Sequence, residues 1–450
     1  MTYGIDHNRD NQVNSSRVRV MFDQQTANPM RRELLRVGVA LPATLLAGGY
    51  VVADFAAEAA PAAKSQDQRV VRDFADPYIE LVRLLHEASE IEHSLMVQYL
   101  YAAFSVKAEY QAIAGYGAAT SNDLMGVAIQ EMQHLGKVNR LLVALGVSPN
   151  MVREAFPYEP GIYPFQFSLE PLTQRSLAKY VYCEAPPSAV DASKAKSAAE
   201  RDFCALLAQN LGFGTRPNFI GSLYTSVIEL IGELADTHDT ALPDLKPWVK
   251  VMEEIKGEGE HGHFQFFKRV FLGTHEGFKG RAGIWQRAPS DAIYPSHSLP
   301  HNPSAYVGHD HQLRDAKALQ LAWLGNLHYW VLLCLLDAGY RYGLPEHTGL
   351  ARAHMLGPFW SLARHLAKLG VGVPFDPLSV GYAPGRERNE NARFIGRLLN
   401  EADKLEQRMH ADLPGDFPRE SCRATLAAIK VGSASKLTYD VRQPWESDWA

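Results

Sequence analysis

The sequence predicts an all-α protein: a four-helix bundle with additional C-terminal helices and long ordered loops. Apolar residues recur every three or four positions through several long stretches, as they do on the buried side of amphipathic helices. Strand-like alternation dominates nowhere in the sequence. Four of the helical stretches are the expected bundle helices, and they span 78–107, 124–145, 218–234 and 245–271.

The second stretch carries a carboxylate and an imidazole on or beside its apolar stripe. Glu131 and His134 are three residues apart, so both side chains reach one point beside the helix. Burying such groups costs free energy unless something compensates them. Glu-x-x-His pairs that hold metal ions inside four-helix bundles are a known solution to this pattern. We therefore expect Glu131 and His134 to bind a metal ion; the alternative for an isolated pair is a polar contact near the surface.

The first stretch has one charged residue on its apolar stripe. This residue is Glu92, which lies between Leu85 and Tyr99 at helical spacing. Glu92 from one helix, with Glu131 and His134 from the next, makes half of a carboxylate-bridged dimetal site.

The fourth stretch repeats the Glu-x-x-His pattern. Glu260 and His263 share a stripe with the aromatic residues that follow them. Glu258 and His261 form a competing pair, and the two nearby glycines loosen the helix enough to allow either. In the third stretch Glu229 lies on the polar side, where it is either a ligand or a solvated carboxylate.

Composition excludes several classes of protein. The 450 residues are 46% hydrophobic, which indicates a globular chain with a large core. The net charge is −5 and no basic block appears, so we expect no nucleic-acid partner. The four cysteines have no C-x-x-C spacing, which argues against a zinc or iron–sulfur site. Cys183 and Cys204 flank a polar loop and are either a disulfide or two buried thiols.

Residues 1–60 resemble a twin-arginine-type export signal with a disordered lead. Arg31 and Arg32 precede an uncharged run, 37–53, and the small residues of 57–59 fit a cleavage site. Pro42 and several glycines make this run a poor membrane anchor, so we expect no stable membrane span after signal removal. The mature protein is then periplasmic or extracellular.

The remaining chain divides into two expected parts. Residues 75–272 form the four-helix bundle. Residues 273–450 supply a lid loop, additional helices that pack on the bundle, and a C-terminal tail.

Four sequence blocks resemble a known family. HEASEIEHSLMVQYLYAAFSVK, AIQEMQHLGKVNRLLVALGVSP, IGSLY and KGEGEHGHFQFF look like the ferritin-like domain of the iminophenyl-pyruvate dimer synthase family. The similarity covers roughly residues 78–270 and continues more loosely to about residue 410. It implies a ferritin-like four-helix bundle and, in the best-known members, oxidative coupling of two amino-acid-derived imines. Many relatives are stand-alone ferritin-like proteins with no assigned reaction.

The resemblance also implies metal ligands. Glu92, Glu131 and His134 match the family's first half-site; in the second half Glu258 stands at the family's carboxylate, with His263 before the aromatic residues. The helix stripe instead favours Glu260, and both alternatives remain. This sequence departs from the family pattern at Ser222, where a glutamate often stands. We therefore expect one tightly held ion, with a second weak or absent unless Glu229 replaces the missing carboxylate.

The sequence as a whole predicts a metal-dependent oxidase or oxygenase of a small organic substrate, such as an amino-acid-derived imine or amine. Carboxylates and neutral imidazoles suit iron, as one or two ions, with manganese as the alternative. The expected partners are the substrate and dioxygen or peroxide, and a homo-oligomer is left open. The alternative function is a non-catalytic metal-binding or stress-protective ferritin-like protein of the cell envelope.

Overall fold

The computed structural model describes residues 70–116, 119–153, 165, 167–212, 219–237, 241–378 and 387–432, and these belong to one compact unit. The expected export signal lies outside the described residues. The fold is all-α, as predicted: the described residues contain helices, turns and two isolated bridges but no strand.

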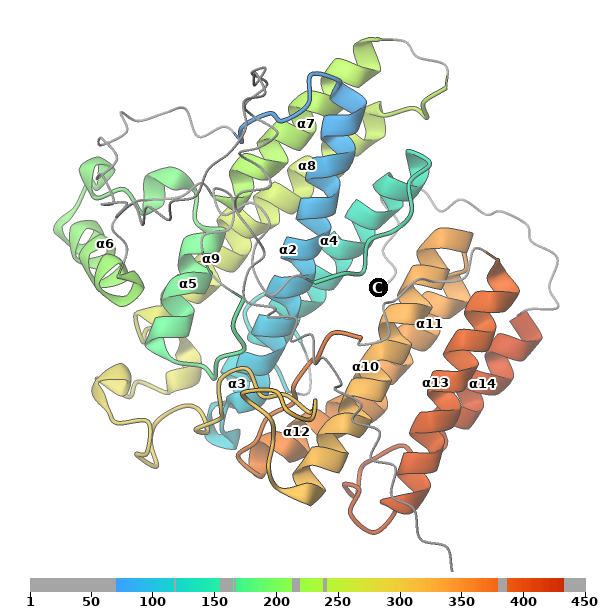
Figure 1. Ribbon diagram of the computed structural model, residues 1–450. Helices are drawn as coiled ribbons and strands as arrows, with labels where there is room; N and C mark the ends of the chain where they lie inside the picture. Colours follow the sequence, from blue (N-terminus) through green and yellow to red (C-terminus); the bar gives the residue numbers. More distant parts are fainter. Residues whose placement is uncertain are drawn as a thin grey trace, which may run out of the picture. The chain divides into compact units, whose positions relative to one another are not determined.

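The first two bundle helices are α2 (Pro77–Ser105) and α4 (Leu124–Ala144), which pack side by side along their length (Figure 1). The Asp76 carboxylate caps α2 by accepting from the backbone N–H groups of its first turn, and Pro77 follows. Asp123 caps α4 in the same way. These caps fix where each helix begins, and with it the position of the Glu and His side chains farther along.

The fourth bundle helix is long and contains a π-helical segment. It consists of α8 (Lys246–Gly257), the π segment η4 (Glu258–His263) and α9 (Phe264–Phe271). A π segment places five residues in the hydrogen-bonded turn where an α-helix has four, so it shifts the side chains that follow. Such segments are frequent at functional sites.

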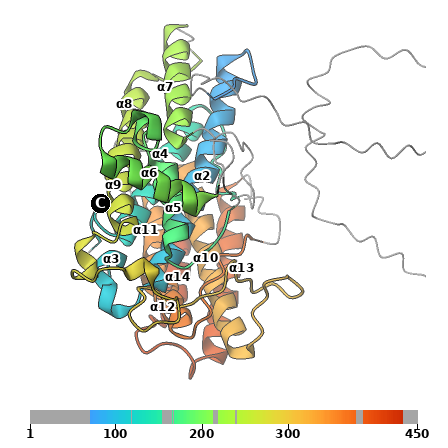
Figure 2. The ribbon, with the colours of Figure 1, turned by 90° about the vertical axis from the view of Figure 1, so that its left-hand side faces the viewer.

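The third position of the bundle is occupied by two shorter helices. α5 (Gln174–Glu184) packs against α9, whereas α7 (Ile220–Asp236) packs against α8 and α2. The expected helix at 218–234 is therefore present as α7, but it covers only part of the fourth helix. In the sequence, α6 (Ala198–Leu211) comes between α5 and α7. It packs against α5, on the side that faces the viewer in Figure 2.

The C-terminal helices form a second group beside the bundle. They are α10 (Ala316–Tyr342), α11 (Pro345–His354), the π segment η7 (Met355–Phe359), α12 (Trp360–Lys368), α13 (Arg388–Arg408) and α14 (Ser421–Gly432). α10 is the centre of the group: it packs against α11, α12 and α13, and it also touches α4. α10 is long and apolar enough to span a membrane, but 83% of its most apolar window is buried inside the protein, as in a core helix.

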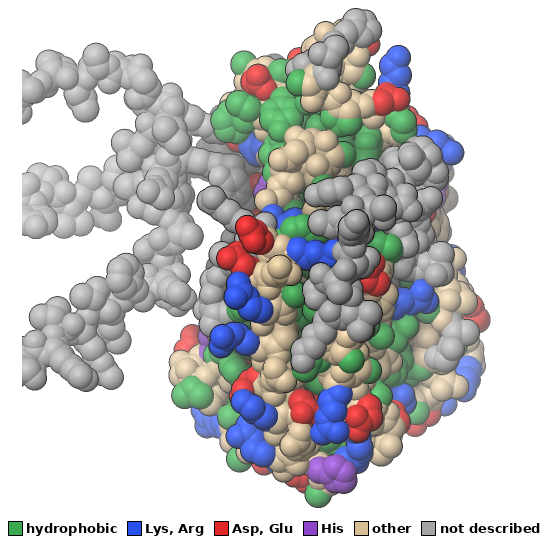
Figure 3. Space-filling model, turned by 90° about the vertical axis from the view of Figure 1, so that its right-hand side faces the viewer, with side chains coloured by type: hydrophobic (Ala, Val, Ile, Leu, Met, Phe, Trp, Pro, Cys, Tyr) green, Lys and Arg blue, Asp and Glu red, His purple; other side chains and the backbone are tan. Residues whose placement is uncertain are grey.

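Short elements complete the described chain: α3 (Gln111–Ala114) and the 3₁₀ turns Ala108–Tyr110, Pro187–Ala189, Ala192–Lys194, Glu276–Phe278 and Ile284–Gln286. The long segment between α9 and α10 contains no α-helix and is held to the bundle, for example by an isolated bridge between Val106 and Ser296. On the face drawn in Figure 3, Lys and Arg side chains are interspersed with Asp and Glu side chains.

Candidate metal centre

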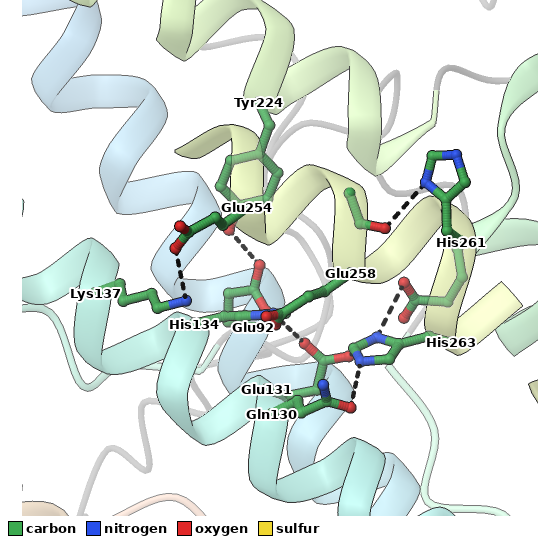
Figure 4. A network of polar contacts seen from close by, with 12 residues as sticks. Glu92, Gln130, Glu131, His134, Lys137, Tyr224, Glu254, Glu258, His261 and His263 are labelled. Atoms are coloured by element: carbon green, nitrogen blue, oxygen red, sulfur yellow. Dashed lines mark hydrogen bonds and ion pairs between the residues drawn. The ribbon is translucent and has the colours of Figure 1, made fainter. Parts of the chain in front are cut away.

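Five acidic and histidine side chains meet in the interior of the bundle. Glu92 comes from α2, Glu131 and His134 from α4, Glu184 from the last position of α5, and His263 from the last position of η4. Each of the five is less than a tenth exposed. Figure 4 shows four of them pointing toward one another between the translucent helices.

Glu131 lies at the centre of this group. Its Oε2 atom is 2.9 Å from Nδ1 of His134, and its Oε1 atom is 2.9 Å from Nδ1 of His263. One carboxylate therefore faces two imidazoles, one on each side.

The two outer carboxylates repeat one arrangement around Glu131. Oε2 of Glu92 is 3.5 Å from Nδ1 of His134, and Oε2 of Glu184 is 3.5 Å from Nδ1 of His263. A tyrosine hydroxyl donates to Oε1 of each: Tyr224 to Glu92, and Tyr99 to Glu184. The site thus consists of two similar halves that share Glu131.

The outer nitrogen of each imidazole also has a partner. Nε2 of His134 is 2.7 Å from Oε2 of Glu258, and Nε2 of His263 is 3.2 Å from the amide oxygen of Gln130. A metal-binding histidine commonly donates its other ring N–H to such an acceptor, which fixes the tautomer and the ring orientation. The two halves differ here, because one acceptor is a carboxylate and the other is a neutral amide.

This arrangement fits two metal ions. When each Nε2–H donates outward, the lone pair of Nδ1 faces a carboxylate oxygen of Glu131, and two acceptors this close repel each other unless a cation lies between them. Nδ1 of His263, Oε1 of Glu131 and Oε2 of Glu92 are buried without a hydrogen bond. Glu92, Glu131 and His134 form one set of converging donors, and Glu131, Glu184 and His263 form a second.

The electrostatics of the site also favour cations. Burial, and then the charge of Glu131, raises the pKa of Glu92 to about 8. Burial alone would lower the pKa of His263, but the carboxylates of Glu131 and Glu184 raise it to about 10. In the metal-free protein, bound protons therefore offset the charge of the clustered carboxylates, and divalent ions could take their place.

Glu184 is the ligand candidate that the sequence analysis missed, and it changes the expected number of ions. Ser222 of α7 stands where the family often has a glutamate; it is buried but belongs to neither donor set. The interrupted third helix supplies Glu184 from α5 instead. A carboxylate thus completes the second half of the site, so the geometry favours two ions over the single strongly bound ion expected from the sequence, and the number of ions stays a prediction.

The remaining candidates lie outside the two donor sets. Glu258 approaches the outer nitrogen of His134, and the π segment explains why: residues five apart share its face, so Glu258 and His263 both point inward. Glu260 is partly exposed and lies near Lys256. Glu229 is exposed on α7. The ring of His261 bonds to the carbonyl of Gly257 and does not reach the centre.

A small cavity adjoins the carboxylates where α5 ends and α7 begins. Its volume is about 20 Å³, and its lining includes Glu92, Glu131, Glu184, Gly221 and Tyr224. A volume of this size holds one water-sized molecule. Lys256 and Glu260 also line it, and both are partly exposed, so they mark the side from which the cavity is reached.

Comparison with known proteins identifies the bundle. Residues 85–255, which contain Glu92, Glu131, His134 and Glu184, match the family model described as Ferritin-like. This chain carries a ferritin-like domain. His263 lies just beyond the matched residues, in the same fourth helix of the ferritin-like bundle.

Two characterised relatives extend the comparison. Dichlorochromopyrrolate synthase of Lentzea aerocolonigenes is 30% identical over 378 residues, which are 71% of this chain and 37% of the relative. The 2-imino-3-(indol-3-yl)propanoate dimerase of Chromobacterium violaceum is 31% identical over 136 residues, which are 24% of this chain and 13% of the relative. The resemblance to the iminophenyl-pyruvate dimer synthase family is thus confirmed, although the chain spans only a minor part of either relative. No solved structure matches the chain.

Proposed function

We propose that this ferritin-like protein is a metal-dependent oxidase or oxygenase of a small amino-acid-derived amine or imine. The observation that carries the proposal is the pair of buried donor sets that share Glu131. Mixed carboxylate and imidazole donors suit iron, with manganese as the alternative. Iron or manganese held there would supply redox chemistry toward dioxygen or peroxide.

The protein's own groups would position the ligands. Tyr224 and Tyr99 each hold one oxygen of an outer carboxylate, so the other oxygen points toward an imidazole. Glu258 and Gln130 fix the two rings from outside. Because the two tyrosines are buried and all four supporting residues lie on helices of the bundle, the ligands are held in place before an ion binds.

The name of the Chromobacterium violaceum relative supports the substrate class, because it refers to an imine of an indole-bearing propanoate. The cavity of about 20 Å³ accepts a molecule the size of dioxygen, but ordinary ligand pockets are roughly ten times larger or more. We therefore place the organic substrate at the mouth of the cavity, where the ammonium group of Lys256 suits a carboxylate. Substrate binding then requires the mouth to widen.

The small cavity also favours a second candidate. A non-catalytic metal-binding or stress-protective ferritin-like protein needs access only for ions, dioxygen or peroxide, and the cavity suits molecules of that size.

Oxygen consumption distinguishes the two candidates. Protein purified without chelators and loaded with iron or manganese is mixed with aromatic amino acids and their imines, and dioxygen or peroxide uptake is recorded with product analysis. An oxidase consumes oxidant in proportion to an organic product, and Glu131→Gln abolishes this turnover. Oxidant uptake that stops after the metal is oxidised, with no organic product, supports the second candidate. A chain that binds no metal contradicts both.

A further inference from the structure

A second buried group of potential ligands lies among the C-terminal helices, outside the ferritin-like site. His328 of α10, Glu406 of α13 and Cys422 of α14 are each less than a tenth exposed. Oε1 of Glu406 is 3.1 Å from Nε2 of His328 and 3.1 Å from Sγ of Cys422. One donor atom from each residue lies within 4.8 Å of the others.

The imidazole of His328 is held from its other side. Its Nδ1 atom is 3.1 Å from Nδ1 of His354, whose Nε2 atom is 2.9 Å from the hydroxyl of Thr425. His354 and Thr425 are also buried. This chain of contacts fixes the His328 ring so that Nε2 points at Glu406, as a supporting partner does for a metal-binding histidine.

The group is incomplete as a hydrogen-bond network. Nε2 of His328 and Oε2 of Glu406 are buried and have no hydrogen-bond partner. An uncompensated carboxylate in a protein interior is costly. Among the described residues, His328 is the ion-pair partner found for Glu406, and no Lys or Arg is paired with it. A cation placed between the three residues would satisfy all of these atoms.

We propose that His328, Glu406 and Cys422 bind one divalent transition-metal ion of borderline softness, with zinc the best match. Imidazole, carboxylate and thiolate are the ligands that zinc takes in proteins. Tetrahedral zinc separates such donor atoms by about 3.4–3.6 Å, so the observed 3.1 Å contacts need only small shifts. Binding forms a Zn–S bond and releases the thiol proton of Cys422, while the unpartnered oxygen of Glu406 or a water fills the fourth position.

The ion would link α10 to α13 and α14, two consecutive helices that come much later in the sequence. α14 has 12 residues and packs mainly against α13 and α11. A bond network from α10 through the ion to α13 and α14 would hold this short helix in place. The spacing of cysteines could not reveal the site, because its single cysteine combines with residues from two other helices.

X-ray absorption spectroscopy of the zinc-loaded, unmodified full chain tests the proposal without any variant. The proposal predicts a sulfur atom at about 2.3 Å from zinc. The ferritin-like donor sets contain no cysteine, so zinc bound there contributes nitrogen and oxygen only. A spectrum with no sulfur contribution would overturn the proposal and leave the proposed oxidase function untouched.

Cobalt substitution identifies the cysteine. Cobalt-loaded protein is expected to show a thiolate-to-cobalt charge-transfer band that Cys422→Ser abolishes. Cys183→Ser and Cys334→Ser serve as controls, because both residues are buried and Cys183 lines the ferritin-like cavity. Both controls should keep the band. A band that survives Cys422→Ser in folded protein, or that disappears in Cys183→Ser, contradicts the assignment.

Discussion

Gly259 lies directly against the carboxylate of Glu184: a Cβ atom at Gly259 would be 2.9 Å from Oε2 of Glu184. That oxygen is the one that faces His263. Because Gly259 has no side chain, the carboxylate of Glu184 has room to approach His263 in the second half of the site.

Replacing Gly259 with alanine should displace Glu184 and weaken the second half-site. We expect Gly259→Ala to lower the metal content from about two ions per bundle toward one, because the set around His134 does not contain Glu184. Gly262→Ala is the matched control, since an added Cβ there meets nothing within 4 Å. Equal metal loss in both variants would indicate a general effect on the helix instead.

The carboxylate of Glu184 itself can be removed without changing its size. Glu184→Gln should cost one ion and leave the other, since Glu92, Glu131 and His134 stay intact. Glu229→Gln, on the exposed side of α7, should leave the metal content unchanged. Elemental analysis of the two variants measures this directly. If Glu229→Gln loses metal and Glu184→Gln does not, the structural assignment of the third helix fails.

The difference between Glu258 and Gln130 predicts that the two ions are bound unequally. A carboxylate partner makes an imidazole a more basic ligand than an amide partner does, and losing such a partner typically lowers metal affinity about 10- to 100-fold. Glu258→Gln makes the two halves alike. Competition with a chelator should therefore show two separate affinities in the unmodified protein and nearly equal ones in the variant. Unchanged titration curves would argue against this role of Glu258.

Much of this site follows from helical spacing. Glu92, Glu131, His134 and His263 lie on or beside apolar stripes of long helices, and those stripes define the inside of the bundle. Glu184 was missed because α5 is short and Glu184 lies where the polar loop between Cys183 and Cys204 was expected to begin. Helical spacing in α5 does indicate that Glu184 faces the core. Leu177, Val181 and Glu184 are four and three residues apart, and the first two are fully buried.

The choice between Glu258 and Glu260 could not be made from the sequence. The helix-stripe argument for Glu260 assumed α-helical geometry, in which a residue three positions before His263 shares its face, whereas the family resemblance favoured Glu258. In the π segment the residue that shares the inward face with His263 is instead Glu258, five residues before it. Tertiary packing decides whether a π segment forms, so helical periodicity alone does not reveal it.

Stability measured against pH should separate the metal-free protein from the loaded one. Folding raises the pKa of His263 to about 10, so the protonated imidazole stabilises the folded protein. This contribution to the free energy of unfolding is complete below pH 6.5 and is lost as the pH rises toward 10. The raised pKa of Glu92, about 8, has the same sign, because ionisation of this buried carboxyl opposes folding. We expect Tm of the chelator-treated protein to fall between pH 7 and pH 10 relative to the loaded protein.

Calorimetric melts of both forms over this range check the expectation. Groups outside the site titrate in both forms, so the difference in Tm isolates the site. A constant difference from pH 7 to pH 10 would show that bound protons do not replace the ions.

We propose that Arg31 and Arg32 direct export of the folded protein, although both lie outside the described residues. Changing both to lysine should retain the protein in the cytoplasm, folded and metal-loaded, because twin-arginine signals depend on the arginine pair. Fractionation of cells that produce either form, with N-terminal sequencing of exported protein, measures the outcome. Efficient export of the double variant would refute the signal.

We propose that Glu131 lies between two metal ions in the bundle, and an anomalous-difference map of crystals measures the positions of such ions. Crystals of protein purified without chelators and loaded with iron should show two peaks beside Glu131, about 3.5–4 Å apart. One peak should lie near Glu92 and His134, and the other near Glu184 and His263. A single peak, or no peak beside Glu131, would contradict the claim.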